Sequence, residues 1–304
     1  ARRQFVDQPA GGDDEHRHQQ RQFGRADARL RRNGRGGFGG RLGWCGDGHA
    51  ASLTQHHAAG PGDGPRRDRR HRGALATMGA MGTLYLVRHG QASFGADDYD
   101  QLSALGARQC EALGRWFAAR GIVFEGVLRG TLRRHVQSLA AITTGCDAAA
   151  LPEALAWPGL NEYDSEALIR SVHAAPLARP DSPEAYRLHF RLLREALTRW
   201  TAGDTAPEGM PSWVQFSAGV AAALDHVRAQ HEGPVLLVSS GGPIATAVHQ
   251  VLGTPARTMV ELNMRIRNSA LTEFSYTRKR HALLSFNHLP HLDTADRRHW
   301  ETFA

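Results

Sequence analysis

Residues 84–90 read Leu-Tyr-Leu-Val-Arg-His-Gly, and this stretch decides the fold of the 304-residue chain. Its first four residues are apolar or aromatic and have the length of a buried strand. Open α/β sheets bind ligands at the carboxyl ends of such strands, where Arg88 and His89 would lie. An imidazole can attack phosphorus while a guanidinium holds two phosphate oxygens. The Arg88-His89-Gly90 triplet therefore predicts a phosphate-binding site. The alternative is that His89 only marks the end of a strand.

Strand and helix patterns alternate after this stretch. We expect further strands over residues 124–128, 152–157, 235–239, 270–276 and 282–286. We expect helices over about 103–120, 131–144, 183–200, 212–230 and 243–252. The alternation predicts an α/β fold, a three-layer sandwich with a mostly parallel sheet flanked by helices, plus a helical insertion over about 164–230.

Four more motifs follow in order. They are Leu102-Ser103-Ala104-Leu105-Gly106, the segment from Gly130 to Ser138, Leu160-Asn161-Glu162, and the segment from Val235 to Gly242. Together with Arg88-His89-Gly90 they resemble the motifs of the histidine phosphatase superfamily, which includes the cofactor-dependent phosphoglycerate mutases. The resemblance covers roughly residues 82–286, so residues 81–304 are expected to form one domain of that kind.

The resemblance implies two catalytic residues. His89 would attack phosphorus and become phosphohistidine, and Glu162 would protonate the leaving group. Asp164 is close enough in the sequence to compete for the acid role. No metal and no cofactor is implied, because arginines would neutralise the charge of the phosphoryl group.

The resemblance also implies a set of substrate-binding residues. Arg88 and Arg134 would hold the phosphoryl group, with Arg134 in the first turn of a helix, where the helix dipole favours an anion. The backbone at Gly90 and Gly241 would leave room for it. Asp100 is expected to belong to a solvated loop.

The chain departs from the family at its second catalytic histidine, which belongs in a Ser-His-Gly-Gly. Here the sequence is Ser239-Ser240-Gly241-Gly242. A hydroxyl at 240 can donate one hydrogen bond but no positive charge, and losing an oxyanion donor typically costs on the order of 10²–10³ in turnover. Ser240 is expected to be a weak phosphate donor or a small residue that only packs. His135 and His249 are expected on a helix surface or in the core rather than as replacements for the missing histidine. Ser240→His is expected to raise turnover; if it does not, another group fills the role, and His135 and Asp164 are the first candidates.

These residues favour a metal-independent phosphomonoester hydrolase of reduced activity, acting on a small phosphorylated substrate. One alternative is a regulatory protein that binds phosphate esters with little turnover. Another is a phosphoglycerate mutase, disfavoured because Tyr163-Asp164-Ser165 stands where the mutases have Arg-His-Tyr-Gly. A homodimer stays an open expectation.

Residues 1–80 differ from the rest in composition. Residues 1–77 hold 15 arginines and 8 acidic residues, whereas residues 78–304 hold 22 basic and 22 acidic residues. The first segment is Gly- and Arg-rich, with too few apolar residues for a core, so we expect it to be disordered. Met78 and Met81 precede the first strand, which favours an upstream sequence translated in error over nucleic-acid binding or targeting.

Other sequence features narrow the class of protein. The three cysteines, Cys45, Cys110 and Cys146, have no metal-ligand or Cys-x-x-Cys spacing. No apolar run approaches the ~20 residues that span a bilayer. We therefore expect a protein of the cytoplasm with no membrane partner.

Overall fold

The computed structural model describes residues 81–93, 100–146, 151–175, 177 and 182–303. The expectations for residues 1–80 lie outside the described residues.

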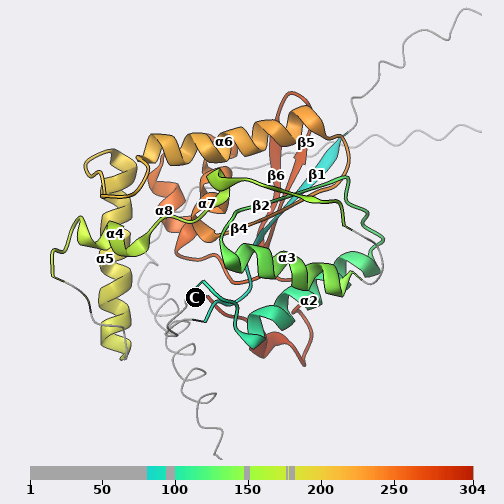
Figure 1. The fold of residues 1–304 in the computed structure, drawn as a ribbon, viewed down its shortest axis with the longest axis horizontal. Helices are drawn as coiled ribbons and strands as arrows, with labels where there is room; N and C mark the ends of the chain where they lie inside the picture. Colours follow the sequence, from blue (N-terminus) through green and yellow to red (C-terminus); the bar gives the residue numbers. More distant parts are fainter. Residues whose placement is uncertain (1–80, 94–99, 147–150, 176, 178–181, 304) are drawn as a thin grey trace, which may run out of the picture. The chain divides into compact units, whose positions relative to one another are not determined.

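Six strands form one mixed sheet in the order β3-β2-β4-β1-β5-β6 (Figure 1). Their bounds are Gly82–Arg88 for β1, Gly126–Arg129 for β2, Ala154–Ala156 for β3, Val235–Ser239 for β4, Leu271–Tyr276 for β5 and His281–His288 for β6. The pairs β1–β4, β4–β2 and β2–β3 are parallel, and β5 and β6 add an antiparallel hairpin. The carboxyl ends of four parallel strands therefore meet at one edge of the sheet.

The strands in the middle of the sheet are the most apolar. All five residues of β4 are buried, which fits its Val-Leu-Leu-Val-Ser sequence. β2 begins two residues later than the expected 124–128, because Phe124 does not pair with a strand. Its ring instead packs edge-on against Tyr85 and Phe117, with ring centroids 5.8 and 5.0 Å away.

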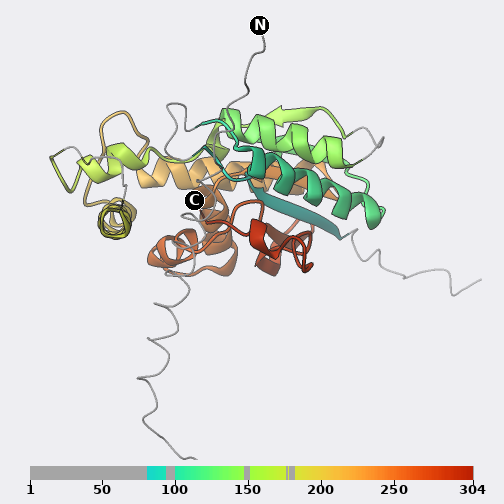
Figure 2. The ribbon, with the colours of Figure 1, turned by 90° about the horizontal axis from the view of Figure 1, so that it is seen from below.

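Helices cover both faces of the sheet (Figures 1 and 2). Their bounds are Ala104–Ala119 for α2, Arg133–Gly145 for α3, Ser165–Arg170 for α4, Pro183–Ala202 for α5, Trp213–Gln230 for α6, Gly241–Leu252 for α7 and Arg257–Asn263 for α8, with 3-10 turns η1 at Pro158–Leu160 and η2 at Arg298–Trp300. Alternate strand residues enter different cores. Leu86 and Leu237 pack with α5 to α8, whereas Val87 and Val238 pack with α2 and α3. The expected three-layer α/β sandwich is confirmed.

The expected helical insertion contains α4, α5 and α6. Helix α5 begins at an N-cap, Ser182, and ends at Gly203, whose φ of 81° is the left-handed conformation that glycine adopts readily. Helix α6 begins with a capping box of Ser212 and Gln215. Its residue Phe216 is buried in the larger core, so α6 also forms part of the helical layer that covers the sheet.

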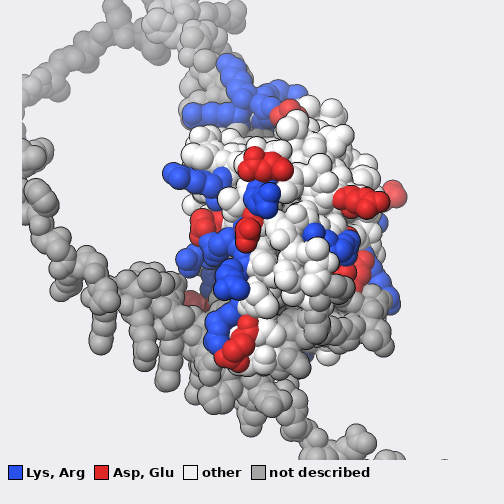
Figure 3. All heavy atoms as spheres, turned by 90° about the vertical axis from the view of Figure 1, so that its left-hand side faces the viewer, with Lys and Arg blue, Asp and Glu red and all other residues white. Residues whose placement is uncertain are grey.

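Both signs of charge are interspersed on the face that carries α4 and α5 (Figure 3). Three ion pairs account for part of this pattern: Arg170–Glu166, Arg187–Glu184 and Arg194–Glu261. Such a mixture gives no strong field of one sign, in keeping with the balanced charge of residues 78–304.

Two further expectations concern the described part of the chain. Cys110 and Cys146 are free thiols in the interior, which fits the prediction that Cys110 behaves as a small buried hydrophobe. Within the described ranges, no helix combines the length and the apolar content that a membrane span requires.

Candidate active site

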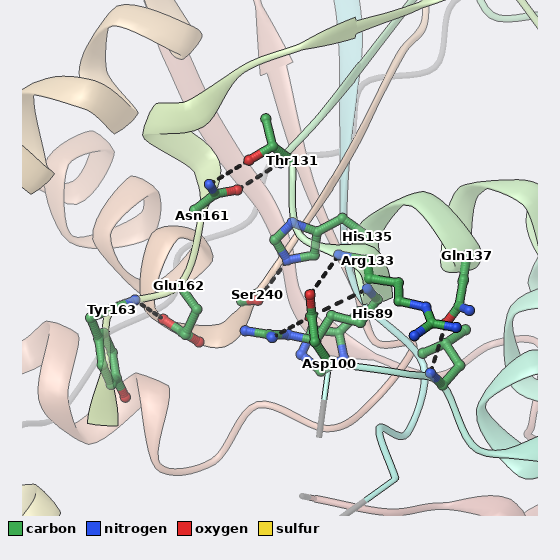
Figure 4. A network of polar contacts seen from close by, with 12 residues as sticks. His89, Asp100, Thr131, Arg133, His135, Gln137, Asn161, Glu162, Tyr163 and Ser240 are labelled. Carbon is green, nitrogen blue, oxygen red and sulfur yellow. Dashed lines mark hydrogen bonds and ion pairs between the residues drawn. The ribbon is translucent and has the colours of Figure 1, made fainter. Parts of the chain in front are cut away.

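The predicted site residues lie on the segments that follow the four parallel strands. His89 follows β1, Arg134 lies in the first turn of α3 after β2, Glu162 follows β3 and η1, and Ser240 follows β4. Figure 4 shows His89, His135, Ser240, Asp100 and Glu162 grouped at this edge of the sheet. The structure therefore brings together residues that are as much as 151 positions apart in the sequence.

The ring of His89 is buried, and its orientation is determined by the next residue. Its Nδ1 lies 2.7 Å from the carbonyl oxygen of Gly90, an acceptor, so Nδ1 carries the proton. The unprotonated Nε2 is then the nitrogen that can act as a nucleophile. Burial, followed by the charges of Arg88, Arg134 and His135, lowers the pKa of His89 well below its usual value. The imidazole is therefore neutral at neutral pH.

The two predicted phosphate-binding arginines have different surroundings. Nη1 of Arg88 donates to the carbonyl oxygens of Ile266 and Phe303, both at 2.5 Å. These contacts tie the guanidinium to the carboxyl-terminal segment. The charge of Arg88 acts on both His89 and Glu162, so Arg88 lies within electrostatic reach of both predicted catalytic side chains.

Arg134 forms an ion pair with Asp100, with Nη1 2.7 Å from Oδ1. The other oxygen of Asp100 accepts a hydrogen bond from the backbone N–H of Arg133 at 2.8 Å, at the start of α3. Asp100 does lie in the loop, as expected, and its side chain is 34% exposed, but its carboxylate is paired with protein groups as well as solvated. Its carboxylate compensates the guanidinium of Arg134, a residue that is 7% exposed, and it satisfies a backbone donor at the helix N-terminus.

Glu162 is partly buried beside the N-terminus of α7. Its two carboxylate oxygens accept from the N–H of Gly242 at 3.1 and 3.2 Å. Burial raises the pKa of Glu162, against the opposite effects of this N–H and of the charges of Arg134 and Arg88. A raised pKa suits a group that must hold a proton before it gives it to a leaving group.

Asp164, the competing acid, has another role. Its Oδ1 accepts from the backbone N–H groups of Glu166 and Ala167 at 2.9 and 3.0 Å. It is thus the exposed N-cap of α4, so of the two residues considered for the acid role, Glu162 is the one at the edge of the sheet near His89.

Ser240 is fully buried and contacts a second histidine that sequence reasoning did not assign to the site. Nε2 of His135 lies 2.7 Å from Oγ of Ser240, and the rings of His135 and His89 are 5.9 Å apart between centroids. Burial, with the charges of Arg134 and Arg129, lowers the pKa of His135 to about 3, so this imidazole is neutral as well. A sequence signal existed: His135 directly follows a predicted site arginine in the first turn of a helix.

The glycines of the site are required by close contacts. A Cβ at residue 90 would lie 2.3 Å from the carbonyl oxygen of Gly106, so Gly90 allows the loop after β1 to pack against α2. A Cβ at Gly242 would lie 2.2 Å from the Glu162 carboxylate, and one at Gly241 would lie 2.6 Å from Oδ1 of Asn263. Gly90 and Gly241, expected to make room for phosphate, thus make room for neighbouring protein groups.

A polar clamp joins two of the loops. Oδ1 of Asn161 accepts from the backbone N–H of Thr131, and Nδ2 of Asn161 donates to Oγ1 of Thr131, both at 2.6 Å. The clamp, visible in Figure 4, holds the start of α3 next to Glu162. Within the described ranges, no group of three histidine, cysteine, aspartate or glutamate side chains is arranged to hold a metal ion.

Several solved structures share the fold. A phosphoglycerate mutase from Bacillus anthracis str. Sterne is 18% identical with a TM-score of 0.51, covering 70% of this chain and 96% of that one. A putative alpha-ribazole-5'-P phosphatase from Escherichia coli str. K-12 substr. MG1655 is 20% identical with a TM-score of 0.50, covering 68% and 96%. YhfR of Bacillus stearothermophilus is 15% identical with a TM-score of 0.52, covering 69% and 98%. No curated protein sequence matches the chain.

The family is shown by the sequence itself. Residues 84–289 match the sequence profile of the Histidine phosphatase superfamily (branch 1), a range that includes His89, Arg134, Glu162 and Ser240. This range spans more than half of the chain and contains all six strands except the first two residues of β1. The chain therefore belongs to the histidine phosphatase superfamily, branch 1.

Proposed function

We propose that the protein hydrolyses phosphate monoesters through a phosphohistidine formed at Nε2 of His89. The observation that carries the proposal is the state of His89. The ring is buried and neutral, its Nδ1 proton is held by Gly90, and two arginines act on it electrostatically. A neutral imidazole with one free nitrogen next to guanidinium groups is suited to attack a dianionic phosphoryl group.

In the first step, Nε2 of His89 forms a bond to phosphorus as the bond from phosphorus to the ester oxygen breaks. Arg88 and Arg134 neutralise the charge of the three remaining oxygens. The departing alkoxide takes a proton from the carboxyl group of Glu162, which the raised pKa of that group favours. The products of the step are a free alcohol, phosphohistidine and the Glu162 carboxylate.

In the second step, the Glu162 carboxylate takes a proton from a water molecule whose oxygen attacks phosphorus. The bond from nitrogen to phosphorus breaks, inorganic phosphate is released, and His89 returns to its neutral form. Because the guanidinium groups neutralise the phosphoryl charge, the chemistry as proposed calls for no metal ion. The substrate class is a small phosphomonoester.

A second candidate is a protein that binds phosphate esters with little turnover. The observation that favours it is the serine at 240, since a hydroxyl cannot supply the positive charge of an imidazolium. The Asp100 carboxylate on Arg134 points the same way, because it offsets part of the charge available to a phosphoryl group. The mutase alternative is weaker, because Tyr163-Asp164-Ser165 stands where the mutases have Arg-His-Tyr-Gly, and Asp164 caps α4.

A phosphatase assay separates these candidates. The purified full chain would be incubated with a panel of phosphomonoesters, with and without EDTA, and released phosphate measured. We expect turnover that EDTA does not change, and an acid-labile, base-stable phosphoryl label on His89 in quenched samples. Binding of phosphate without release or label would favour the second candidate, and a requirement for a bisphosphorylated primer would favour the mutase.

A further inference from the structure

His135 and Ser240 form a buried pair that the proposed mechanism does not use. The two side chains meet at 2.7 Å, and both residues are 0% exposed. They come from different elements, since His135 lies in the first turn of α3 and Ser240 lies between β4 and α7. Figure 4 shows the pair next to His89.

The hydroxyl of Ser240 does not cap the helix that follows it. Ser240 occupies the N-cap position of α7, and a serine there usually accepts a hydrogen bond from the helix's first turn. Here its side chain makes no capping bond. The hydroxyl is turned toward His135 instead, so a contact across the fold replaces a local one.

The space for the imidazole is built into the neighbouring loop. A Cβ at Gly130 would lie 2.1 Å from Nδ1 of His135, so any other residue at 130 would displace the ring. Nδ1 itself has no hydrogen-bond partner. A buried N–H without an acceptor is rarer and more costly than a buried lone pair without a donor. The proton therefore belongs on Nε2, which donates to Oγ of Ser240.

This direction of the hydrogen bond has a consequence for Ser240. Because Oγ accepts from His135, the hydroxyl hydrogen of Ser240 does not point at that ring. It is left to donate to another acceptor. A phosphoryl oxygen bound between the arginines and His89 would be such an acceptor.

We propose that His135 is a positioning residue for the transfer of the phosphoryl group, acting through Ser240. Its Nε2–H holds the Ser240 hydroxyl in the orientation in which Oγ–H donates to a phosphoryl oxygen. The pair thus takes over the hydrogen-bonding part, though not the positive charge, of the family's second histidine. The inference rests on the proposed function and adds a specific residue to it.

The neutral state of His135 agrees with this role. The charges of Arg134 and Arg129, together with burial, disfavour the imidazolium, so the ring is a donor at one nitrogen and an acceptor at the other. A neutral donor that has no rotational freedom in the core is ready before substrate arrives, which is what effective transition-state stabilisation requires.

A double-mutant cycle tests the inference. Ser240→Ala removes the donor, and we expect kcat/KM to fall by about 10- to 100-fold. His135→Leu keeps similar volume without an N–H, and we expect a fall of roughly fivefold, the worth of one hydrogen bond. Combining both substitutions should cost no more than Ser240→Ala alone, because the two act as one unit.

His135→Gln is the matched control, since its amide N–H can still reach Ser240. We expect it to restore kcat/KM to within about threefold of wild type, and all variants should keep their melting temperatures within a few degrees. If His135→Leu costs the same factor with serine or alanine at 240, or if His135→Gln rescues nothing, His135 has a structural role and the inference is overturned.

The same cycle can be measured without turnover. Calorimetry can measure the affinity for inorganic phosphate of the wild type, the two single variants Ser240→Ala and His135→Leu, and the double variant. These four affinities report whether Ser240 and His135 act together on the anion. If the wild type neither hydrolyses esters nor labels His89, the proposed function fails. Coupled losses of phosphate affinity would still support the inference in that case, and independent losses would refute it.

Discussion

The two buried histidines of the candidate site, His89 and His135, are held in different ways. The ring of His89 is oriented by the carbonyl group of the next residue, so a chain that delivers Arg88-His89-Gly90 to the end of a buried strand orients it locally. The ring of His135 is oriented by Ser240, 105 positions further along the chain. The orientation of the proposed nucleophile is therefore a property of one short segment, whereas that of its neighbour depends on how α3 packs against the junction of β4 and α7.

We expect the largest loss of activity from a substitution of His89, the locally oriented histidine. His89→Ala removes the nucleophile, and we expect kcat to fall by about 10³-fold or more with loss of the phosphoryl label. Phosphate binding should survive, since Arg88 and Arg134 remain. A variant that keeps the wild-type rate would show that the reaction does not run through His89.

Glu162→Gln should affect esters according to their leaving group. We expect a loss of about 10²–10⁴ for an alkyl phosphate, whose alkoxide needs a proton, and a smaller loss in the first step for p-nitrophenyl phosphate. The aryl ester should then give a burst of nitrophenol followed by slow turnover. An equal loss on both esters, without a burst, would argue against the acid role.

The pH profile tests the same group and His89 together. Because the pKa of Glu162 is raised, the acid form persists to a higher pH than in an exposed glutamate, and the alkyl rate should fall as pH rises through that value. Because the pKa of His89 is lowered, the imidazole stays neutral as pH falls below its usual value of 6.5, so activity should persist in mild acid. The basic limb should disappear in Glu162→Gln. A rate that rises steadily from pH 5 to 8 would contradict both assignments.

Ser240→His tests the contact between His135 and Ser240, which depends on the tertiary structure. The expected gain from Ser240→His assumed free space after residue 240, but a side chain extending along the Ser240 Oγ direction meets the ring of His135. Overpacking a core typically costs about 1–3 kcal/mol, so we now expect Ser240→His to lower both the melting temperature and kcat, by roughly tenfold for the rate.

The double variant His135→Ala/Ser240→His should reverse that loss. It removes one imidazole as it adds the other, and we expect kcat at or above wild type, with His135→Ala alone below it. A clear rise in turnover for Ser240→His with His135 still present would mean that the ring of His135 can move aside and does not position the hydroxyl.

Asp100→Asn should have the smallest effect. It removes a negative charge next to Arg134 but keeps an oxygen to accept from the N–H of Arg133. Repulsion between unit charges in water is about 1 kcal/mol at 4 Å, so the Kd for inorganic phosphate should fall by roughly fivefold. Calorimetry at two salt concentrations checks this, and weaker phosphate binding would show that Asp100 supports the site rather than competing for it.

Much of the fold could be predicted because burial dictates it locally. The apolar runs at residues 84–87 and 235–238 both became central strands, since such runs are stable only where both faces of a sheet are covered. The start of β2 was predicted too early because Phe124 has the composition of a strand residue. Its ring packs instead into an aromatic cluster, a contact that involves residues far apart in the sequence.

The same distinction between local sequence and tertiary packing applies to the candidate site. The sequence by itself determined the family and the residues that follow each parallel strand, His89, Arg134, Glu162 and Ser240, because strand ends place side chains by backbone geometry alone. Tertiary structure decided what those residues touch: Asp100 on Arg134, Gly242 on Glu162, and His135 on Ser240. Hydrogen bonds and ion pairs of this kind depend on distances of a few ångströms between separate elements, and these distances arise only when the layers pack.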